Sequence, residues 1–187
     1  MSQIYIGIDG AAKNAGAAVI DCSNRRPRFL RGIEFIGEHE GDAHAALQNL
    51  ILNVSRHDVL GGIGPDWSAA IEQHAVFTRR GSDGKGHTNP VTTGEMMQAD
   101  GIICGCWYAL IGRAPVRLKP TEWRKEYGRK PRGFWSNKKN ALELAHQIFN
   151  HEFKDHNIAE AALIAYALHL REKRAAVWAK AKKGGGE

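Results

Sequence analysis

The sequence has little cysteine and no long uncharged hydrophobic run. Its three cysteines, Cys22, Cys104 and Cys106, are odd in number and lack the paired spacing of a metal site, so we expect reduced thiols. No stretch approaches the roughly 18 apolar residues of a membrane span. The N-terminal residues also lack the basic region and apolar core of a signal peptide. These absences predict a cytoplasmic protein without a membrane segment.

Internal repeats and obvious linkers are also missing. The chain of 187 residues is long enough for one domain with a substantial core, whereas two domains would be cramped. We therefore expect one domain over residues 1–175 and a flexible tail over 176–187, which is basic and rich in glycine. The net charge of +6 favours a polyanionic partner.

Hydrophobic patterning predicts a mixed α/β chain. Apolar runs predict strands at 4–8, 17–20, 28–36, 69–72 and 115–119, of which the first three would form an antiparallel meander. Helical spacing predicts helices at 42–54, 95–111, 120–124, 136–149 and from about 157 to 174. The polar stretch 78–94 is expected to be a long loop, and such loops are often functional.

The first predicted strand ends in a carboxylate. Ile4, Ile6 and Ile8 alternate as in a buried strand, and Asp9 follows where the apolar run stops. Small residues and Gly16 then form a turn that lets other groups approach closely. This arrangement suits metal or phosphate chemistry. The alternative is a hairpin in which the acid only caps a turn.

Two later stretches supply further acids. Glu72 ends a second apolar run, and a glutamate so close to a buried strand must be paired, metal-bound or neutralised. Asp155, His156, Asn157 and Glu160 lie at the start of an apolar helix. Asn157 and Glu160 have the spacing of a helix cap, which is the alternative explanation. Against it, small apolar residues flank Glu160, so its helix face is expected to pack inward.

Taken together, Ile6-Gly-Ile-Asp9-Gly with Gly16, Ala-Ile-Glu72-Gln73 and Asp155-His-Asn-Ile-Ala-Glu160 resemble the RuvC family of Holliday junction resolvases. The phage-type and divergent members are the most similar. Intervening segments match as well, in the same order from about residue 4 to 170: Met96-Met-Gln-Ala-Asp-Gly101, Lys119-Pro-Thr-Glu-Trp-Arg124 and Lys138-Lys139-Asn-Ala-Leu. The sequence departs from the family in two places. Gly10-Ala11 replaces the usual proline after the first aspartate, and Asn157 replaces the acid found in many members.

The resemblance implies a ribonuclease H-like α/β fold with a central five-stranded mixed sheet, in the order 3-2-1-4-5, flanked by helices. It also implies a homodimer that cuts four-way DNA junctions by symmetric nicks. Asp9, Glu72 and Glu160 would be metal-binding acids, and the fourth ligand is open among Asp155, His156 and Asn157, of which we favour Asp155. Two Mg²⁺ ions about 3.5–4 Å apart would serve phosphodiester hydrolysis, and Mn²⁺ should substitute.

Basic residues provide candidate DNA contacts. Lys139, or its neighbour Lys138, matches a basic position of the family and is the candidate catalytic phosphate contact. Other candidates for the junction arms or centre are Phe77, Arg79, Arg80, Lys85, Arg124, Arg129, Lys130 and Arg132. The basic run 171–183 either holds DNA or is a solvated helix extension. Phe134 and Trp135 either stack on bases or pack in the protein.

Other functional classes remain open from the sequence. An actin-like or sugar-kinase ATPase also begins with a strand, an acid and a glycine turn, but it needs two such halves, and 187 residues barely accommodate one. A non-cleaving branched-DNA-binding protein of the same fold would tolerate loss of the acids. A related nuclease could act on forks, flaps or other branched DNA. The expected setting is the cytoplasm of a bacterial or phage-infected cell.

Overall fold

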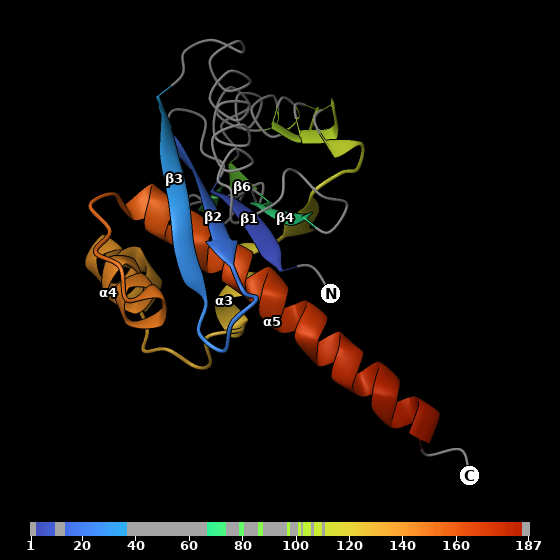
Figure 1. The fold of residues 1–187 in the computed structure, drawn as a ribbon. Helices are drawn as coiled ribbons and strands as arrows, with labels where there is room; N and C mark the ends of the chain where they lie inside the picture. The colour runs from blue at the N-terminus through green and yellow to red at the C-terminus, as the bar shows by residue number, and fades with distance from the viewer. Residues whose placement is uncertain are drawn as a thin grey trace.

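A five-stranded mixed sheet lies at the centre of the computed structural model (Figure 1). The structure describes residues 3–9, 14–36, 67–73, 79–80, 86–87, 97, 101, 103–105, 107–109 and 111–184. The strands of the sheet are β1 (Ile4–Asp9), β2 (Asn14–Asp21), β3 (Arg28–Ile36), β4 (Trp67–Glu72) and β7 (Val116–Leu118). Their order is β3-β2-β1-β4-β7. The first three are antiparallel, while β1, β4 and β7 are parallel. The predicted sheet and strand order are confirmed.

The helices of the second half are α3 (Pro120–Lys125), the 3₁₀ turn η1 (Phe134–Ser136), α4 (Lys138–Phe149) and α5 (His156–Gly184). Helix α4 begins two residues later than predicted because Asn137 caps it, accepting the backbone N–H of Lys139 at 3.1 Å. Helix α5 continues without a break through 176–184, which the sequence analysis assigned to the tail. No helix in the described part of the chain is long and apolar enough to cross a membrane.

Several predicted elements fall in partly described regions. The helix predicted at 42–54 lies outside the described residues. Described positions of the helix predicted at 95–111 are helical, with Ile103 and Trp107 buried. The stretch predicted as a loop at 78–94 contains a short antiparallel pair, β5 (Arg79–Arg80) with β6 (Gly86–His87).

The alternation of side chains along β1 divides the core into two layers. Ile4, Ile6 and Ile8 pack on one face against Ile71 and Trp107. Tyr5 packs on the other face with residues from α3, α4 and α5. Because side chains alternate with a period of two, Gly7 and Asp9 belong to the same face as Tyr5. The acid at the end of β1 therefore lies on the side of the sheet that α5 covers.

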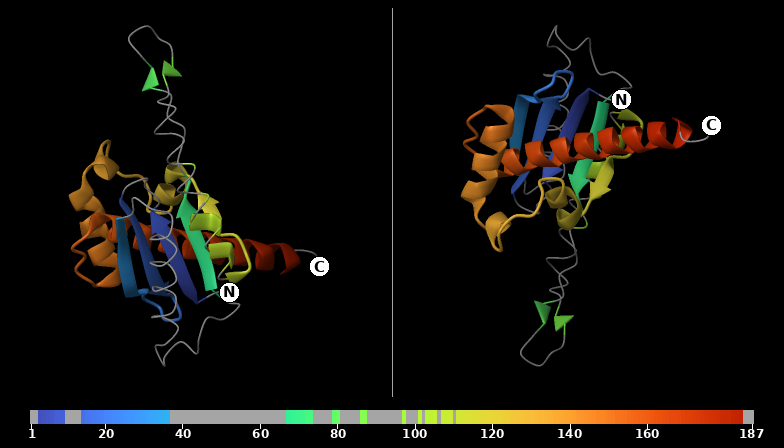
Figure 2. Two further views of the ribbon diagram at one scale, coloured as in Figure 1. Left: turned by 90° about the horizontal axis from the view of Figure 1, so that it is seen from above. Right: turned by 90° about the horizontal axis from the view of Figure 1, so that it is seen from below.

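Glycines on β1 and β2 allow α5 to contact the sheet backbone directly. A Cβ atom at Gly7 would lie only 1.8 Å from the Ala161 carbonyl oxygen, and one at Gly16 would lie 2.5 Å from the Asn157 carbonyl oxygen. No larger residue fits without moving the helix. This close approach fixes the first turns of α5 over β1 and β2. Figure 2 shows α5 crossing the sheet, with its C-terminal part extending past the sheet edge.

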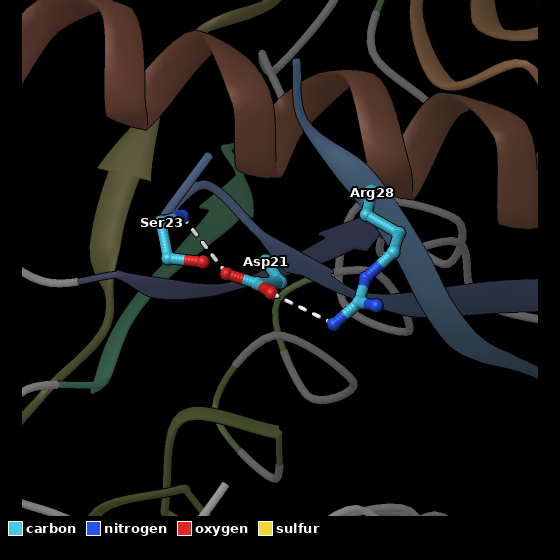
Figure 3. A network of polar contacts seen from close by, with 3 residues as sticks. All are labelled: Asp21, Ser23 and Arg28. Carbon is cyan, nitrogen blue, oxygen red and sulfur yellow. Dashed lines mark hydrogen bonds and ion pairs between the residues drawn. The ribbon is translucent and has the colours of Figure 1, made fainter. Parts of the chain in front are cut away.

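A buried carboxylate holds the turn between β2 and β3. Asp21 accepts the backbone N–H of Ser23 at 2.8 Å and a guanidinium N–H of Arg28 at 3.0 Å (Figure 3). Its side chain is almost fully buried, while that of Arg28 is more than half exposed. Asp21 is thus an acid with a structural role, at the opposite end of β2 from Gly16.

Candidate active site

Asp9 and Glu72 end two neighbouring parallel strands. Ile8 of β1 pairs with Ile71 of β4, so the next residues of both strands reach the same edge of the sheet. Side chains alternate along a strand, so Glu72 lies on the same sheet face as Ala70, and Asp9 lies on the same face as Tyr5. Tyr5 and Ala70 both pack in the layer under α5. Both carboxylates are buried, with exposed fractions of 9% for Asp9 and 8% for Glu72.

Glu160 joins these two acids from the first turns of α5. Gly16, the register partner of Asp9, contacts Asn157, so the start of α5 lies over the end of β1. Burial raises the pKa of Asp9 well above its usual value, and the nearby charges of Glu160 and Glu72 raise that pKa further. The pKa of Glu160 is also raised, first by burial and then by Glu72. The three acids therefore form one electrostatically coupled cluster.

Trp123 holds Glu72. Its indole Nε1–H donates to Glu72 Oε2 at 2.7 Å, and the indole itself is fully buried. The start of α3 positions this ring, since Glu122 accepts the backbone N–H of Lys119 at 2.9 Å and Pro120 begins the helix. From the sequence this segment was predicted as a short helix, and its tryptophan was given no role. A contact across 51 positions leaves no signal in residue spacing.

Arg124 brings a positive charge to the same cluster. Its charge lowers the pKa of both Asp9 and Glu160, which partly offsets the burial and the repulsion. The guanidinium carbon lies 5.0 Å from the ring centre of Trp123 and 5.5 Å from that of Trp135. We expected Arg124 to contact DNA, and the structure brings it next to the acids.

Asp155 caps α5. Its Oδ1 accepts the backbone N–H of Ile158 at 2.9 Å, so the cap is Asp155 and not Asn157, which lies buried within the first turn. The charge of Asp155 also contributes to the raised pKa of Asp9. Asp155 is thus close enough to act on the cluster while one of its oxygens is occupied by the cap. His156 begins the helix and is partly exposed.

The cluster suits a hard divalent cation in its chemistry. Its donors are carboxylate oxygens, which Mg²⁺ prefers, and its four acids outnumber the two cations that act on them, Arg124 and Lys138. In the described ranges, no three His, Cys, Asp or Glu side chains come together in a closed set of metal ligands.

The remaining predicted residues have different positions. Lys138 and Lys139 are both exposed at the start of α4, and the charge of Lys138 lowers the pKa of Glu160. Lys130 lies with its Nζ 5.2 Å from the ring centre of Phe134. Arg129 and Arg132 are exposed between α3 and η1. Phe77 and Lys85 lie outside the described residues, and of Arg79 and Arg80 only the strand is described.

Trp135 packs within the protein. Its ring meets that of Trp123 edge to face, with centres 5.0 Å apart, and that of Phe134 in the same way. Both residues of the pair Phe134 and Trp135 are partly exposed. Packing is therefore the observed role of Trp135, since it supports the tryptophan that holds Glu72.

These features define the class of fold. The strand order β3-β2-β1-β4-β7, flanked by helices, is that of a ribonuclease H-like fold. No known protein family and no curated protein sequence matches the chain.

Two groups of solved structures are similar. RuvC from Thermus thermophilus, also solved in complex with a Holliday junction substrate, aligns with a TM-score of 0.64 at 13% identity, over 92% of this chain and 96% of that one. The fowlpox virus Holliday junction resolvase aligns with a TM-score of 0.51 at 10% identity, over 90% and 98%. The RuvC-like fold predicted from the motifs is confirmed.

Proposed function

We propose that this chain is a metal-dependent endonuclease that cuts four-way DNA junctions by paired symmetric nicks. The observation that carries the proposal is the electrostatic coupling of Asp9, Glu72 and Glu160, which come from three separate elements to one edge of the sheet. Gathering like charges in a protein interior is costly, and a divalent cation compensates for that cost. The similarity to an RuvC solved with a Holliday junction supports DNA as the substrate.

In this proposal, Asp9, Glu72, Glu160 and Asp155 hold two Mg²⁺ ions, for which Mn²⁺ substitutes. When bound, the ions would supply an activated water and offset the charge on the leaving oxygen. Asp9 would hold the ions together with the other three acids, whose charges all raise its pKa. Trp123 fixes the orientation of Glu72 through the donated hydrogen bond.

Basic side chains around the cluster would bind the DNA backbone. Lys138 is the stronger candidate for a phosphate contact near the acids, because its charge acts on Glu160, and Lys139 lies beside it. The connector between α3 and η1 would contact the duplex arms through its basic residues, the exposed Arg129 and Arg132 and the partly exposed Lys130. From the sequence alone, Phe77 is proposed for the junction centre, and Arg79, Arg80 and Lys85 are proposed for the duplex arms.

The proposed active assembly is a homodimer. A four-way junction has two-fold symmetry, and two symmetric nicks require two equivalent sites. Each chain contributes one acid cluster, so two copies related by a two-fold axis would match the two scissile linkages.

The test is incubation of the protein with four-way, forked, flapped and linear DNA, each with Mg²⁺ or with EDTA. We expect paired, symmetric nicks in the four-way junction, only with Mg²⁺. Cleavage of forks or flaps at equal rates would assign the protein to a broader branched-DNA nuclease. Binding of junctions without any cleavage, over a range of Mg²⁺ and Mn²⁺ concentrations, would make it a non-cleaving junction-binding protein.

A further inference from the structure

The C-terminal part of α5 carries an exposed stripe of basic and aromatic side chains. Residues at intervals of three and four share one face of a helix, and the stripe consists of Arg171, Arg174, Ala175, Trp178, Ala179 and Lys182. Together with Glu126 they line a shallow hollow of about 500 Å³. This part of α5 extends past the edge of the sheet in Figure 1 and Figure 2, so the stripe is not part of the core.

The stripe has the composition of a surface for the DNA backbone. Residues 171–183 contain six Lys or Arg residues and one acid, Glu172. Trp178 is 65% exposed, in the middle of the three basic side chains of the stripe. A cationic face neutralises phosphates, while a large aromatic ring among the cations packs against sugars or bases. Charge complementarity therefore favours nucleic acid over a neutral or basic protein surface.

Helix α3 connects the stripe with the acid cluster. Arg124 acts on Asp9 and Glu160, and Glu126, two residues later, forms an ion pair with Arg174 of the stripe. The stripe thus lies on the α3 side of α5, as the cluster does. From Glu160 to Lys182 the helix advances about 33 Å at 1.5 Å per residue. That length corresponds to about 10 base pairs of duplex at 3.4 Å each.

We propose that this stripe binds the phosphate backbone of one duplex arm of the substrate, between about half a turn and one turn of DNA from the linkage that is cut. The proposal rests on the proposed function and adds to it a second contact on the same arm. It predicts that the contribution of the stripe to affinity depends on arm length, because a shorter arm ends before it reaches Lys182.

The experiment compares two double variants with equal loss of charge. Arg171→Gln with Lys182→Gln alters the stripe, while Lys173→Gln with Lys180→Gln alters the opposite face of the same helix. Arg174 is kept because it pairs with Glu126. Affinity is measured by fluorescence anisotropy on four-way junctions with arms of about 20 or about 6 base pairs, the short arms closed by hairpin loops, over a range of KCl concentrations.

We expect the stripe variant to bind the long-armed junction about tenfold more weakly, and the slope of log affinity against log salt to fall by about 1 to 2. On short arms the stripe variant should bind only about threefold more weakly, because an arm of about 6 base pairs spans about 20 Å and reaches Arg171 but not Lys182. The opposite-face variant should bind like the wild type on both junctions. Equal weakening by the two variants, equal weakening on short and long arms, or no weakening would overturn the proposal. A change in oligomeric state of the stripe variant, by analytical ultracentrifugation, would also overturn it by assigning the face to a contact between copies.

The two proposals fail in different ways. If the stripe does not bind DNA but the nuclease proposal is right, the wild type and the stripe variant both cut short-armed and long-armed junctions with Mg²⁺. If the chain is not a nuclease, neither protein cuts either junction. The arm-length effect on binding is measured in EDTA and is independent of cleavage.

Discussion

Replacing Asp9 by asparagine should stabilise the metal-free protein while it removes the proposed activity. Asp9 is buried, and its pKa is raised first by burial and then by Glu160 and Glu72. The folded state therefore binds a proton at this carboxyl more tightly than the unfolded state does. The protonated carboxyl of Asp9 therefore stabilises the folded state. This contribution is fully present below pH 3.8, the pKa of the carboxyl in the unfolded chain, and is lost as the pH rises through its pKa in the folded state. Asparagine has no charge to bury at any pH.

The size of the gain has an upper bound. At pH 7 the penalty on a carboxyl with an unfolded pKa near 3.8 cannot exceed about 4 kcal/mol, because each pH unit corresponds to about 1.4 kcal/mol. The positive charge of Arg124 reduces the penalty. We expect Asp9→Asn to raise the free energy of unfolding by about 1 to 3 kcal/mol at pH 7. For a chain of this length that is a rise of about 2 to 4 °C in melting temperature per kcal/mol.

The assay is urea unfolding in EDTA at several values between pH 5 and pH 8. The gain from Asp9→Asn should grow with pH, while Glu143→Gln, at an exposed position of α4, should change stability little. Mg²⁺ should stabilise the wild type more than the variant, because only the wild type has the full set of acids. Destabilisation by Asp9→Asn, or a gain that does not depend on pH, would refute the reasoning about the cluster.

Three further predictions test the surroundings of the site. Trp123→Phe removes the hydrogen bond to Glu72, so single-turnover cleavage should slow by about 10- to 100-fold while the junction affinity stays unchanged. An unchanged cleavage rate would show that this hydrogen bond does not position Glu72. Gly7→Ala puts a Cβ 1.8 Å from the Ala161 carbonyl oxygen and should lower the free energy of unfolding by about 3 kcal/mol or more, measured by urea unfolding. An unchanged urea midpoint would contradict the close packing of α5 against β1. Burial lowers the pKa of His169, so the free energy of unfolding should fall as the pH drops from about 6.5 through the lower pKa of the folded state. The variant His169→Gln should show a weaker pH dependence in unfolding curves. An identical pH profile would assign the pH dependence to other groups.

The sheet was predictable because it follows from a local rule. Alternation with a period of two marks a strand, and the apolar runs of β1 and β4 each end in an acid. Two parallel neighbours bring those acids to one edge. The family motifs supplied the pairing order, which periodicity alone does not contain. The short hairpin β5–β6 was missed because a stretch of polar and glycine residues has no apolar pattern.

The details of the candidate site depend on contacts that sequence spacing does not encode. The bond from Trp123 to Glu72 joins residues 51 positions apart. Which of Lys138 and Lys139 lies nearer the acids depends on how α4 is oriented about its own axis. Lys138 is the one whose charge acts on Glu160. The cap of α5 moved from Asn157 to Asp155 because the helix begins one residue earlier than predicted. The catalytic, metal-binding and DNA-binding roles of the named residues remain predictions.

The most direct test of the nuclease proposal is single-turnover cleavage of a four-way junction, with Mg²⁺ titrated, by the wild type, Asp9→Asn and Glu160→Gln. We predict paired nicks by the wild type with a rate that rises with Mg²⁺, and no nicks by either variant, while both still bind the junction in an anisotropy assay. Cleavage by Asp9→Asn or Glu160→Gln at the wild-type rate would contradict the assignment of the acid cluster as the active site.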